Sequence, residues 1–537
     1  MSSQSDRVAF DNAVQPHDET ILFKDKNWTY IVDSTSNGGN FNSQLQFDLN
    51  TLASQSQWVN LSEAYIQVPV RVKIKNVGGA SAASVSTVLN QTVLKSGFHN
   101  LIDSVQVVLD GSTVQASQIY ENISTTFKML TEWSKDELQK YGPSLGIGLD
   151  DYTDLDNTAI GTLAPATWGI DLFDTANSGI AARQSVQNIG ATTGAASSIL
   201  AAQAKNVGKA QVATVSAATV AVGAHAYTQF VLATIRLKDI SPVIAGLPMT
   251  RNLKGFLYLN YNSSTTTITY DATPALVSVS TTPQSGRICP GMINNNALTG
   301  LAKASAQWEV AFELSGVATD LTAAQPQISF GRLVCPYYVA NPTVDSALSM
   351  KKTFRYLERN VTTFDVSAGA NTTVTLSPGI ANPKRVLLFP YFTGSSTVSN
   401  LLSNPLLSVV DSCPATTSPF AALKDLQILV GNVPMFQNPV SMDWDLFGQE
   451  VAQLGLDGGL DSQAGSGLLS QQMWDRLYRF YTCDVSRRLE SEGGSSKSVI
   501  VQCTNATVCN MRVIAMIYYE KEITIDTSMG RIYQGRA

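Results

Sequence analysis

The chain has 537 residues, of which 44% are apolar and only 15% are charged, and its formal net charge is −6. A single hydrophobic core rarely supports more than about 250–300 residues, so two domains are expected. Nucleic-acid binding is disfavoured as the main function because phosphate contacts need clustered cations, and the longest basic cluster comprises only Lys351, Lys352, Arg355 and Arg359.

The first residues of the chain are polar and lead into no apolar stretch, so no signal peptide is expected. No run of apolar residues is long enough for a membrane-spanning helix. We therefore expect assembly in a reducing cytosol or nucleus. The six cysteines show no Cys-x-x-Cys spacing and are expected to be reduced and mostly buried, with a Cys503–Cys509 disulfide as the alternative.

Strand signals dominate the first half of the chain. Residues 44–49 and 66–75 alternate apolar and polar side chains, as half-buried strands do. Pro69 lies within the second of these runs and cannot donate a ladder hydrogen bond, which predicts a sheet edge or a bulge. The β-branched run from Leu101 ends in Asp110 and Gly111, a pair typical of a β-hairpin turn.

Few helices are predicted. Apolar residues recur at helical spacing from Tyr120 to Leu130, and Ser134 with Glu137 forms a capping box that opens a further turn. A matching helix is predicted at 442–454 in the second half. Each helix follows a strand and a hairpin signal, which suggests helices at the corners of β-barrels.

Two loops stand out by composition. Residues 175–226 have mostly small side chains and include no acidic residue, which predicts a long exposed surface loop. Before it, Asp151, Asp154 and Asp156 belong to the densest acidic cluster. A solvated acidic turn is favoured there over a structural calcium site, because the glycine and terminal glutamate of an EF-hand loop are missing. No other metal and no cofactor is expected.

The second half repeats the segment order of the first. The strand at 423–430 ends in Gly431 and Asn432, the predicted helix follows, and a glycine-rich loop spans 455–470. These segments match the first-half hairpin, helix and loop, and the runs 477–485 and 512–519 match 227–237 and 256–261. The joint between the two halves is expected near 290–302. Further strands are predicted at 308–314, 327–334, 384–389 and 499–503.

Enzyme signatures are missing from the sequence. His17, His99 and His225 are far apart and lack the spacing of metal ligands. Neither a Gly-x-Ser-x-Gly elbow nor a phosphate-binding loop occurs. Core or interface packing is favoured over sugar stacking for the tryptophans that adjoin strand or helix signals, which are Trp28, Trp58, Trp133, Trp308, Trp444 and Trp474.

The order of several segments resembles one family. These segments are Trp28–Asp33, Gly39–Asn42, Gln46–Asp48, Ser62–Pro69, Thr126–Leu130, Trp133–Asp136, Tyr141–Pro143, Phe480–Arg487 and Ile517–Ile525. Together with the chain length, they resemble the major capsid proteins of small eukaryotic DNA viruses, of the Polinton-like virus and virophage type. The likeness spans most of the chain except the predicted loop at 175–226.

The resemblance implies an all-β fold of two tandem eight-stranded jelly-roll barrels with short helices in inter-strand loops, at 1–295 and 296–537. It also implies a non-enzymatic protein of the virion capsid. Three copies would form a pseudo-hexameric capsomer of an icosahedral shell, assembled in the host cytoplasm or nucleus. The implied partners are neighbouring capsomers, penton or vertex proteins and minor capsid proteins. No direct sequence-specific contact with nucleic acid is implied. The resemblance does not decide whether a membrane lies beneath the shell.

Two other classes remain as alternatives. A secreted carbohydrate-binding or adhesin β-protein is opposed by the lack of a signal peptide and of a disulfide pattern. A hydrolase on a β-sandwich is opposed by the lack of nucleophile and metal motifs, and would require a catalytic role for Asp151 or Asp154.

Overall fold

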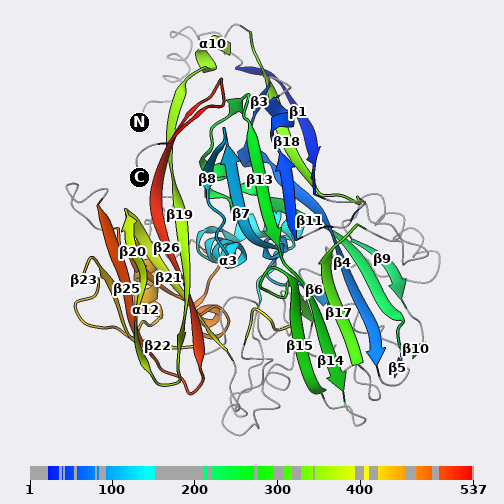
Figure 1. Ribbon diagram of the computed structural model, residues 1–537, viewed down its shortest axis with the longest axis vertical. Coiled ribbons are helices and arrows are strands. Elements are labelled where there is room, and N and C mark those ends of the chain that lie inside the picture. Colours follow the sequence, from blue (N-terminus) through cyan, green and yellow to red (C-terminus); the bar gives the residue numbers. More distant parts are fainter. Residues whose placement is uncertain are drawn as a thin grey trace, which may run out of the picture.

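The computed structural model describes residues 22–150 and 210–534 apart from gaps in loops, the longest at 84–91, 294–306, 317–327, 394–403, 410–420, 454–466 and 487–494. Strands dominate these residues and the helices are short, which confirms the all-β prediction (Figure 1). Within the described residues, no helix combines the length and apolar character that crossing a bilayer requires.

The C-terminal part of the chain forms a pair of sheets, the second β-unit. If its eight main strands are numbered along the chain, one sheet has the strand order 1-8-3-6 and the other sheet has the strand order 2-7-4-5. The first sheet contains β19 (Lys351–Val366), β26 (Met511–Asp526), β21 (Pro383–Phe392) and β24 (Tyr481–Asp484), extended by β27 (Ile532–Gln534). The other sheet contains β20 (Asn371–Ala381), β25 (Ser496–Asn505), β22 (Leu423–Val430) and β23 (Val433–Pro434).

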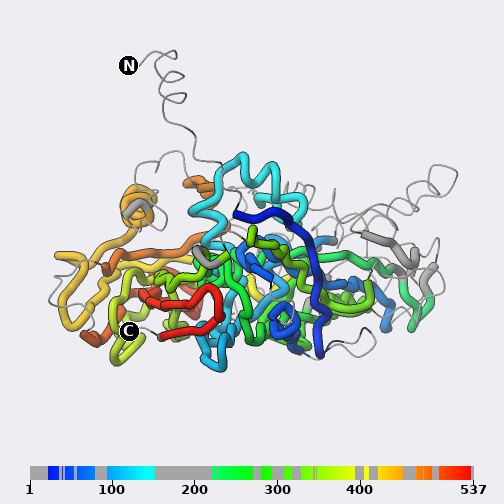
Figure 2. The backbone as a smooth tube through the Cα atoms, turned by 90° about the horizontal axis from the view of Figure 1, so that it is seen from above, coloured from blue at the N-terminus to red at the C-terminus, as the bar shows by residue number. Residues whose placement is uncertain are grey.

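The N-terminal part, the first β-unit, repeats the same strand order. One sheet contains β1 (Phe23–Val32), β18 (Arg332–Ala340), β4 (Tyr65–Gly78) and β11 (His225–Arg236). The other sheet contains β2 (Gln44–Asp48), β13 (Gly255–Tyr261), β7 (Ile102–Leu109) and β8 (Ser112–Gln115). The duplication inferred from the sequence is therefore a duplication of topology, and the two units lie side by side (Figure 2).

The first β-unit carries additional strands. They are β3 (Trp58–Val59), β5 (Ala82–Ala83), β6 (Thr92–Leu94), β9 (Ala210–Val215), β10 (Thr219–Val220), β12 (Thr250–Arg251), β14 (Ser263–Tyr270), β15 (Leu276–Ser285), β16 (Gly291–Ile293) and β17 (Gln307–Leu314). Of these, β17, β14 and β15 add in succession to β4 and lengthen its sheet. They are inserted in the chain between β13 and the closing strand β18.

This insertion moves the joint between the two halves. The closing strand β18 ends at Ala340 and pairs with β1 and β4, so the N-terminal sheet continues well past the expected boundary at 295/296. The sequence-based match of 512–519 with 256–261 is therefore wrong. The segment 512–519 lies in β26, and the strand at the same position in the first unit is β18. The segment 256–261 lies in β13, and the strand at the same position in the second unit is β25. We propose that the joint lies between Ala340 and Lys351, because the inserted strands delay the closing strand by some 70 residues relative to β13.

The predicted loop at 175–226 contains strand residues. Its first part, 175–209, lies outside the described residues. Beyond that part, β9 pairs with β11 in the main sheet and β10 pairs with β5. The loop prediction is wrong for these residues, because valine and threonine in 210–220 suit strands more strongly than the surrounding alanines suit a loop.

Helices occupy the connections between strands. The described helices are α2 (Asn50–Ala53), η1 (Leu61–Glu63), η3 (Phe98–Leu101), α3 (Glu121–Glu132), α4 (Lys135–Leu145), α7 (Leu237–Ile240), α8 (Pro242–Gly246), α10 (Asp345–Leu348), α12 (Trp444–Gln453) and α13 (Gln471–Arg476). The two longer predicted helices are thus confirmed as α3 and α12. The side chain of Ser134 accepts from the Glu137 amide, which confirms the predicted cap of α4.

Both predicted hairpins form for the expected reason. Asp110 and Gly111 have φ angles of 48° and 76°, and Gly431 and Asn432 have φ angles of 59° and 66°. Two consecutive residues with positive φ match the right-handed twist of the flanking strands, which favours glycine, asparagine and aspartate at these positions.

Pro69 departs from its prediction because β4 is an interior strand. The Pro69 carbonyl accepts from the Ser315 amide, just where β17 ends and before β18 begins to pair with β4 at Gln67. The N–H and C=O of a strand residue point to the same side. The missing N–H of Pro69 therefore faces the junction between two neighbouring strands, where no ladder bond is interrupted.

Each unit encloses a separate hydrophobic core. The first core combines side chains from both sheets of the first unit, including Phe47, Trp308 and Phe312. The second core is built mainly by the second unit and also includes Phe127 of α3, which comes from the first half of the chain. Helix α3 therefore packs its apolar side against the second unit and links the two cores.

The described cysteines support the reduced-thiol prediction. Cys289, Cys335, Cys483, Cys503 and Cys509 are buried thiols, so the Cys503–Cys509 disulfide is not formed. Burial raises the pKa of Cys335 to about 12 and that of Cys503 to about 11, which keeps these thiols protonated and unreactive at neutral pH.

Candidate functional site

The acidic residues that the sequence singled out fall outside the described residues, namely Asp151, Asp154 and Asp156. The preceding Asp150 is buried, and its Oδ2 accepts from the Tyr478 hydroxyl at 2.6 Å. Among the described residues, no three histidine, cysteine or acidic side chains are grouped closely enough to hold a metal ion. The solvated acidic turn predicted at 151–156 therefore stays a prediction, with a calcium site as its alternative.

His99 has a structural environment. It lies buried in η3, with its Nε2 at 2.8 Å from the Thr126 hydroxyl on α3. His225 begins β11, and His17 lies outside the described residues. The structure thus brings neither histidine in the described part of the chain into a group with acidic residues or cysteines.

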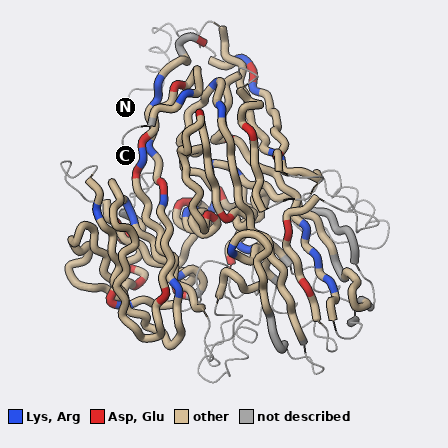
Figure 3. Tube along the Cα trace, viewed as in Figure 1, with Lys and Arg blue, Asp and Glu red and all other residues tan. Residues whose placement is uncertain are grey.

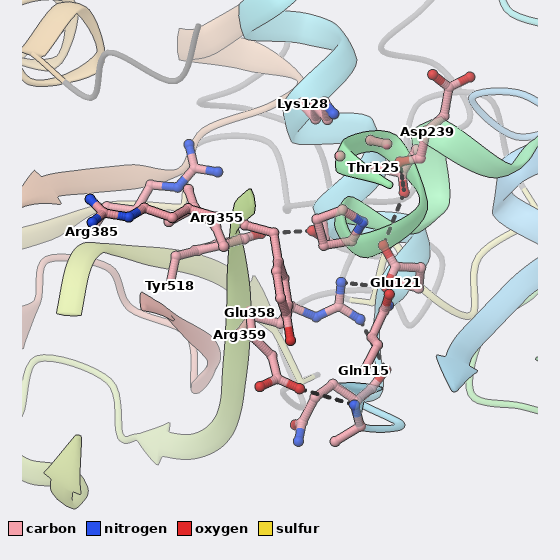
Figure 4. A pocket seen from close by; sticks show the side chains of 18 of the residues that line it. Gln115, Glu121, Thr125, Lys128, Asp239, Arg355, Glu358, Arg359, Arg385 and Tyr518 are labelled. Atoms are coloured by element: carbon pink, nitrogen blue, oxygen red, sulfur yellow. Dashed lines mark hydrogen bonds and ion pairs between the residues drawn. The ribbon is translucent and has the colours of Figure 1, made fainter. Parts of the chain in front are cut away.

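Buried charged residues gather where the two β-units meet, between α3 of the first half and β19 of the second (Figures 3 and 4). The Arg359 Nη1 and the Glu121 Oε2 are 2.5 Å apart, and both side chains are less than one-tenth exposed. Arg359 Nη2 also donates to the Gln118 carbonyl at 2.9 Å. One guanidinium therefore fixes both the start of α3 and the segment that leads into it.

Neighbouring residues of β19 add further contacts to this joint. Glu358 accepts from the Ala116 amide at 2.9 Å and from the Tyr519 hydroxyl at 2.8 Å, and it forms an ion pair with Lys521. The Tyr356 hydroxyl donates to the Val114 carbonyl at 2.6 Å. Because these groups reach the backbone of β8 and of the residue directly after it, they fix the position of one unit against the other.

A cavity of about 310 Å³ opens beside this joint. Its charged lining consists of four basic and four acidic residues, which are Lys128, Arg355, Arg359, Arg385, Glu121, Glu132, Asp239 and Glu358. The equal numbers leave no excess charge to select an anion or a cation. The arrangement suits a structural joint between two rigid bodies better than a ligand site.

The joint has a predictable pH dependence. Burial raises the pKa of the Glu121 carboxyl above its usual range, against the opposing effect of Arg359. A carboxyl whose pKa is higher in the folded protein contributes stability at low pH that is lost as the pH rises through the folded value. We expect the unfolding free energy of the wild type, relative to Glu121→Gln, to rise as the pH falls from about 7 towards 4.5. Urea unfolding across this range measures it, and a difference that is constant or moves the other way contradicts it.

A second feature lies on the surface of the first β-unit and is called the aromatic face. On β1, Trp28 is 52% exposed, Tyr30 is 56% exposed and Val32 is 43% exposed. Alternate residues of a strand share one face, and residues directly opposite on a paired strand share it too. The aromatic face therefore comprises Lys26, Trp28, Tyr30, Val32, Tyr65, Arg332 and Tyr338.

Cations lie against the rings of this face. The Lys26 ammonium is 5.3 Å from the Trp28 ring and 5.2 Å from the Tyr338 ring, and the Arg332 guanidinium is 5.9 Å from the Tyr30 ring. Strand β1 also forms the edge of its sheet, since it pairs only with β18 among the described strands. Exposed aromatic rings beside arginine are the composition typical of protein–protein contacts.

No family model and no curated protein sequence matches the chain. Solved structures do match. The chain is similar to one from the cryo-EM structure of the Sputnik virophage, with a TM-score of 0.50 and 11% identity, covering 96% of this chain and 89% of the other. It has the double jelly-roll fold. The double jelly roll is similar also to the mavirus major capsid protein, with a TM-score of 0.49 and 12% identity over 95% of this chain and 90% of the other.

Sequence reasoning did not identify the two surfaces of this double jelly roll. Glu121 and Arg359 are more than 200 positions apart, and only the fold brings them together. A weak signal was present, because Glu121 adjoins the apolar stripe of α3 and a charge beside such a stripe must find a partner. Trp28 was assigned to core or interface packing, and its exposure excludes the core.

Proposed function

We propose that this chain is the major capsid protein of a virus and that its function is self-assembly. The observation that carries the proposal is the repeated strand order, two eight-stranded jelly rolls in one chain. The likeness in fold to a chain of the Sputnik virophage structure, which covers 96% of this chain, supports the proposal. The protein would act as a non-enzymatic building block located in the virion.

Three copies would form a capsomer with six barrels and a pseudo-hexagonal outline. Such capsomers would tile an icosahedral shell, with vertex proteins and minor capsid proteins as further partners. Neither jelly roll requires direct contact with nucleic acid, in line with the small basic clusters of the chain. Assembly would take place in the host cytoplasm or nucleus.

Negative-stain images of the purified protein test this proposal. Particles with three-fold symmetry and a nearly hexagonal outline are the expected result. Monomeric particles that bind glycans on an array would contradict the proposal and favour the carbohydrate-binding alternative.

The sparse surface charge leads to a second expectation. Only 15% of residues are charged, so the contacts between copies should depend little on ion pairs. Screening at about 1 M salt reduces the range of electrostatic attraction to about 3 Å. We expect trimers to persist under these conditions in light-scattering measurements. Dissociation in molar salt, with intact trimers at low salt, would show that charge pairs hold the copies together.

A further inference from the structure

The aromatic face has a candidate partner elsewhere on the same chain. The segment 433–445 joins β23 to the start of α12, and its first residue, Val433, is 58% exposed. Pro434 is exposed too, and Met435 and Phe436 are half-buried. The first four residues of this segment therefore present apolar surface on the second jelly roll, and exposed polar residues follow them.

The charges of the two surfaces are opposite in sign. Residues 433–445 contain two exposed carboxylates, Asp443 and Asp445, and no lysine or arginine. The aromatic face carries Lys26 and Arg332, and the exposed Lys24 lies at its end. Lys26 forms an ion pair with Glu63, and the exposed Asp25 follows Lys24 on β1, so the surface keeps an excess of one positive charge. Two aromatic faces placed against each other would bring these cations together. The same cations would be matched by the carboxylates of the 433–445 segment.

The two surfaces lie on opposite sides of the molecule. Strands β1 and β18 form one flank of the first unit, whereas β22, β23 and α12 lie across the second unit on the other side (Figure 1). Two different patches on opposite sides cannot meet within one chain. They can meet between copies, and such head-to-tail contacts close into a ring when the rotation permits.

We infer that the aromatic face of one copy binds the 433–445 segment of the next copy, an inference that rests on the trimer proposed above. Trp28 and Tyr30 anchor the contact. A Trp or Tyr ring contributes about 150–250 Å² when fully buried, so two half-exposed rings supply about 200 Å² of the roughly 800 Å² that a stable interface needs on each partner. The neighbouring strands of each flank supply the remainder.

Two variants that each damage one surface test this inference. Tyr30→Asp and Val433→Asp each replace an apolar contact side chain of one surface with a carboxylate, which the contact would strip of water at a cost in free energy. Each is expected to weaken self-association by at least about thirtyfold, the effect of losing one strong anchor residue. Size-exclusion chromatography with light scattering then shows monomers where the wild type forms trimers.

A mixture of the two variants provides the sharper result. The Val433→Asp chain keeps an intact aromatic face, and the Tyr30→Asp chain keeps an intact 433–445 segment. One good contact can therefore form, and the mixture is expected to yield one-to-one dimers but no trimers. No dimers in the mixture, or trimers in either variant alone, would overturn the inference.

Val508→Asp serves as the matched control. Val508 is 86% exposed in the turn after β25, whereas the β22–β23 hairpin contacts the beginning of β25 through the Gly431 amide and the Ser498 carbonyl. This control is expected to form trimers like the wild type, and monomers here would overturn the assignment of the two surfaces. A monomeric wild type would overturn the proposed function as well, whereas trimeric variants beside a trimeric wild type overturn only the pairing of the flanks.

Discussion

Replacing Arg359 with alanine is expected to lower the free energy of unfolding by about 3–5 kcal/mol, because it leaves a buried carboxylate without its counter-charge. Glu121 is the buried first residue of α3, and Arg359 is its ion-pair partner. The variant also loses the hydrogen bond from Arg359 to the Gln118 carbonyl. Denaturant unfolding followed by circular dichroism measures the loss.

A double variant separates the charge from the packing. Glu121→Leu combined with Arg359→Met removes both charges and fills a similar volume. Replacing a buried ion pair in this way is often neutral or stabilising by about 1–4 kcal/mol. We expect the double variant to recover most of the stability that Arg359→Ala loses. A double variant as unstable as the single one would show that the joint depends on the geometry of the ion pair and not on its charge balance.

The ion pair also explains how the two jelly rolls behave as one body. Tyr356 of β19 contacts β8, and its near neighbours Glu358 and Arg359 contact the segment between β8 and α3. Helix α3 in turn packs Phe127 into the second core. A shift of one unit against the other would break buried polar contacts and apolar packing together. The proposed ring of copies would require two jelly rolls fixed against each other in this way.

Local features of the fold could be predicted because each depends on a few adjacent residues. The turn at Asp110 and Gly111 needs two positive φ angles, and the cap at Ser134 needs one hydroxyl and one nearby amide. Helix α3 could be predicted from its apolar spacing. In each case the signal and the structure occupy the same short stretch of chain.

Features that depend on distant pairing could not be predicted in this way. The strands β14, β15 and β17 have ordinary strand sequences, and only their pairing with β4 shows that they extend the first jelly roll. The boundary was therefore expected too early, at 295/296. The same holds for the ion pair of Glu121 with Arg359, since neither residue has a recognisable motif around it.

The tryptophans provide the second large expected effect. Trp474→Ala is expected to lower the free energy of unfolding by about 3–5 kcal/mol, the usual range for removing a buried aromatic side chain. Trp474 is 1% exposed, its Nε1 donates to the Phe480 carbonyl at 2.8 Å, and its ring centroid is 5.0 Å from that of Phe447. Alanine would leave a cavity beside that ring and an unsatisfied carbonyl.

Trp28→Ala is the matched control, since the same substitution on the aromatic face removes a ring that is 52% exposed. Surface substitutions usually change stability by no more than about 0.5 kcal/mol, so monomeric Trp28→Ala should unfold nearly like the wild type. If the proposed interface is correct, Trp28→Ala instead weakens the association between copies. Equal losses of unfolding free energy in the two variants at a concentration where the wild type is monomeric would show that Trp28 is part of a core. Circular dichroism suits both measurements, because either variant alters tryptophan fluorescence by itself.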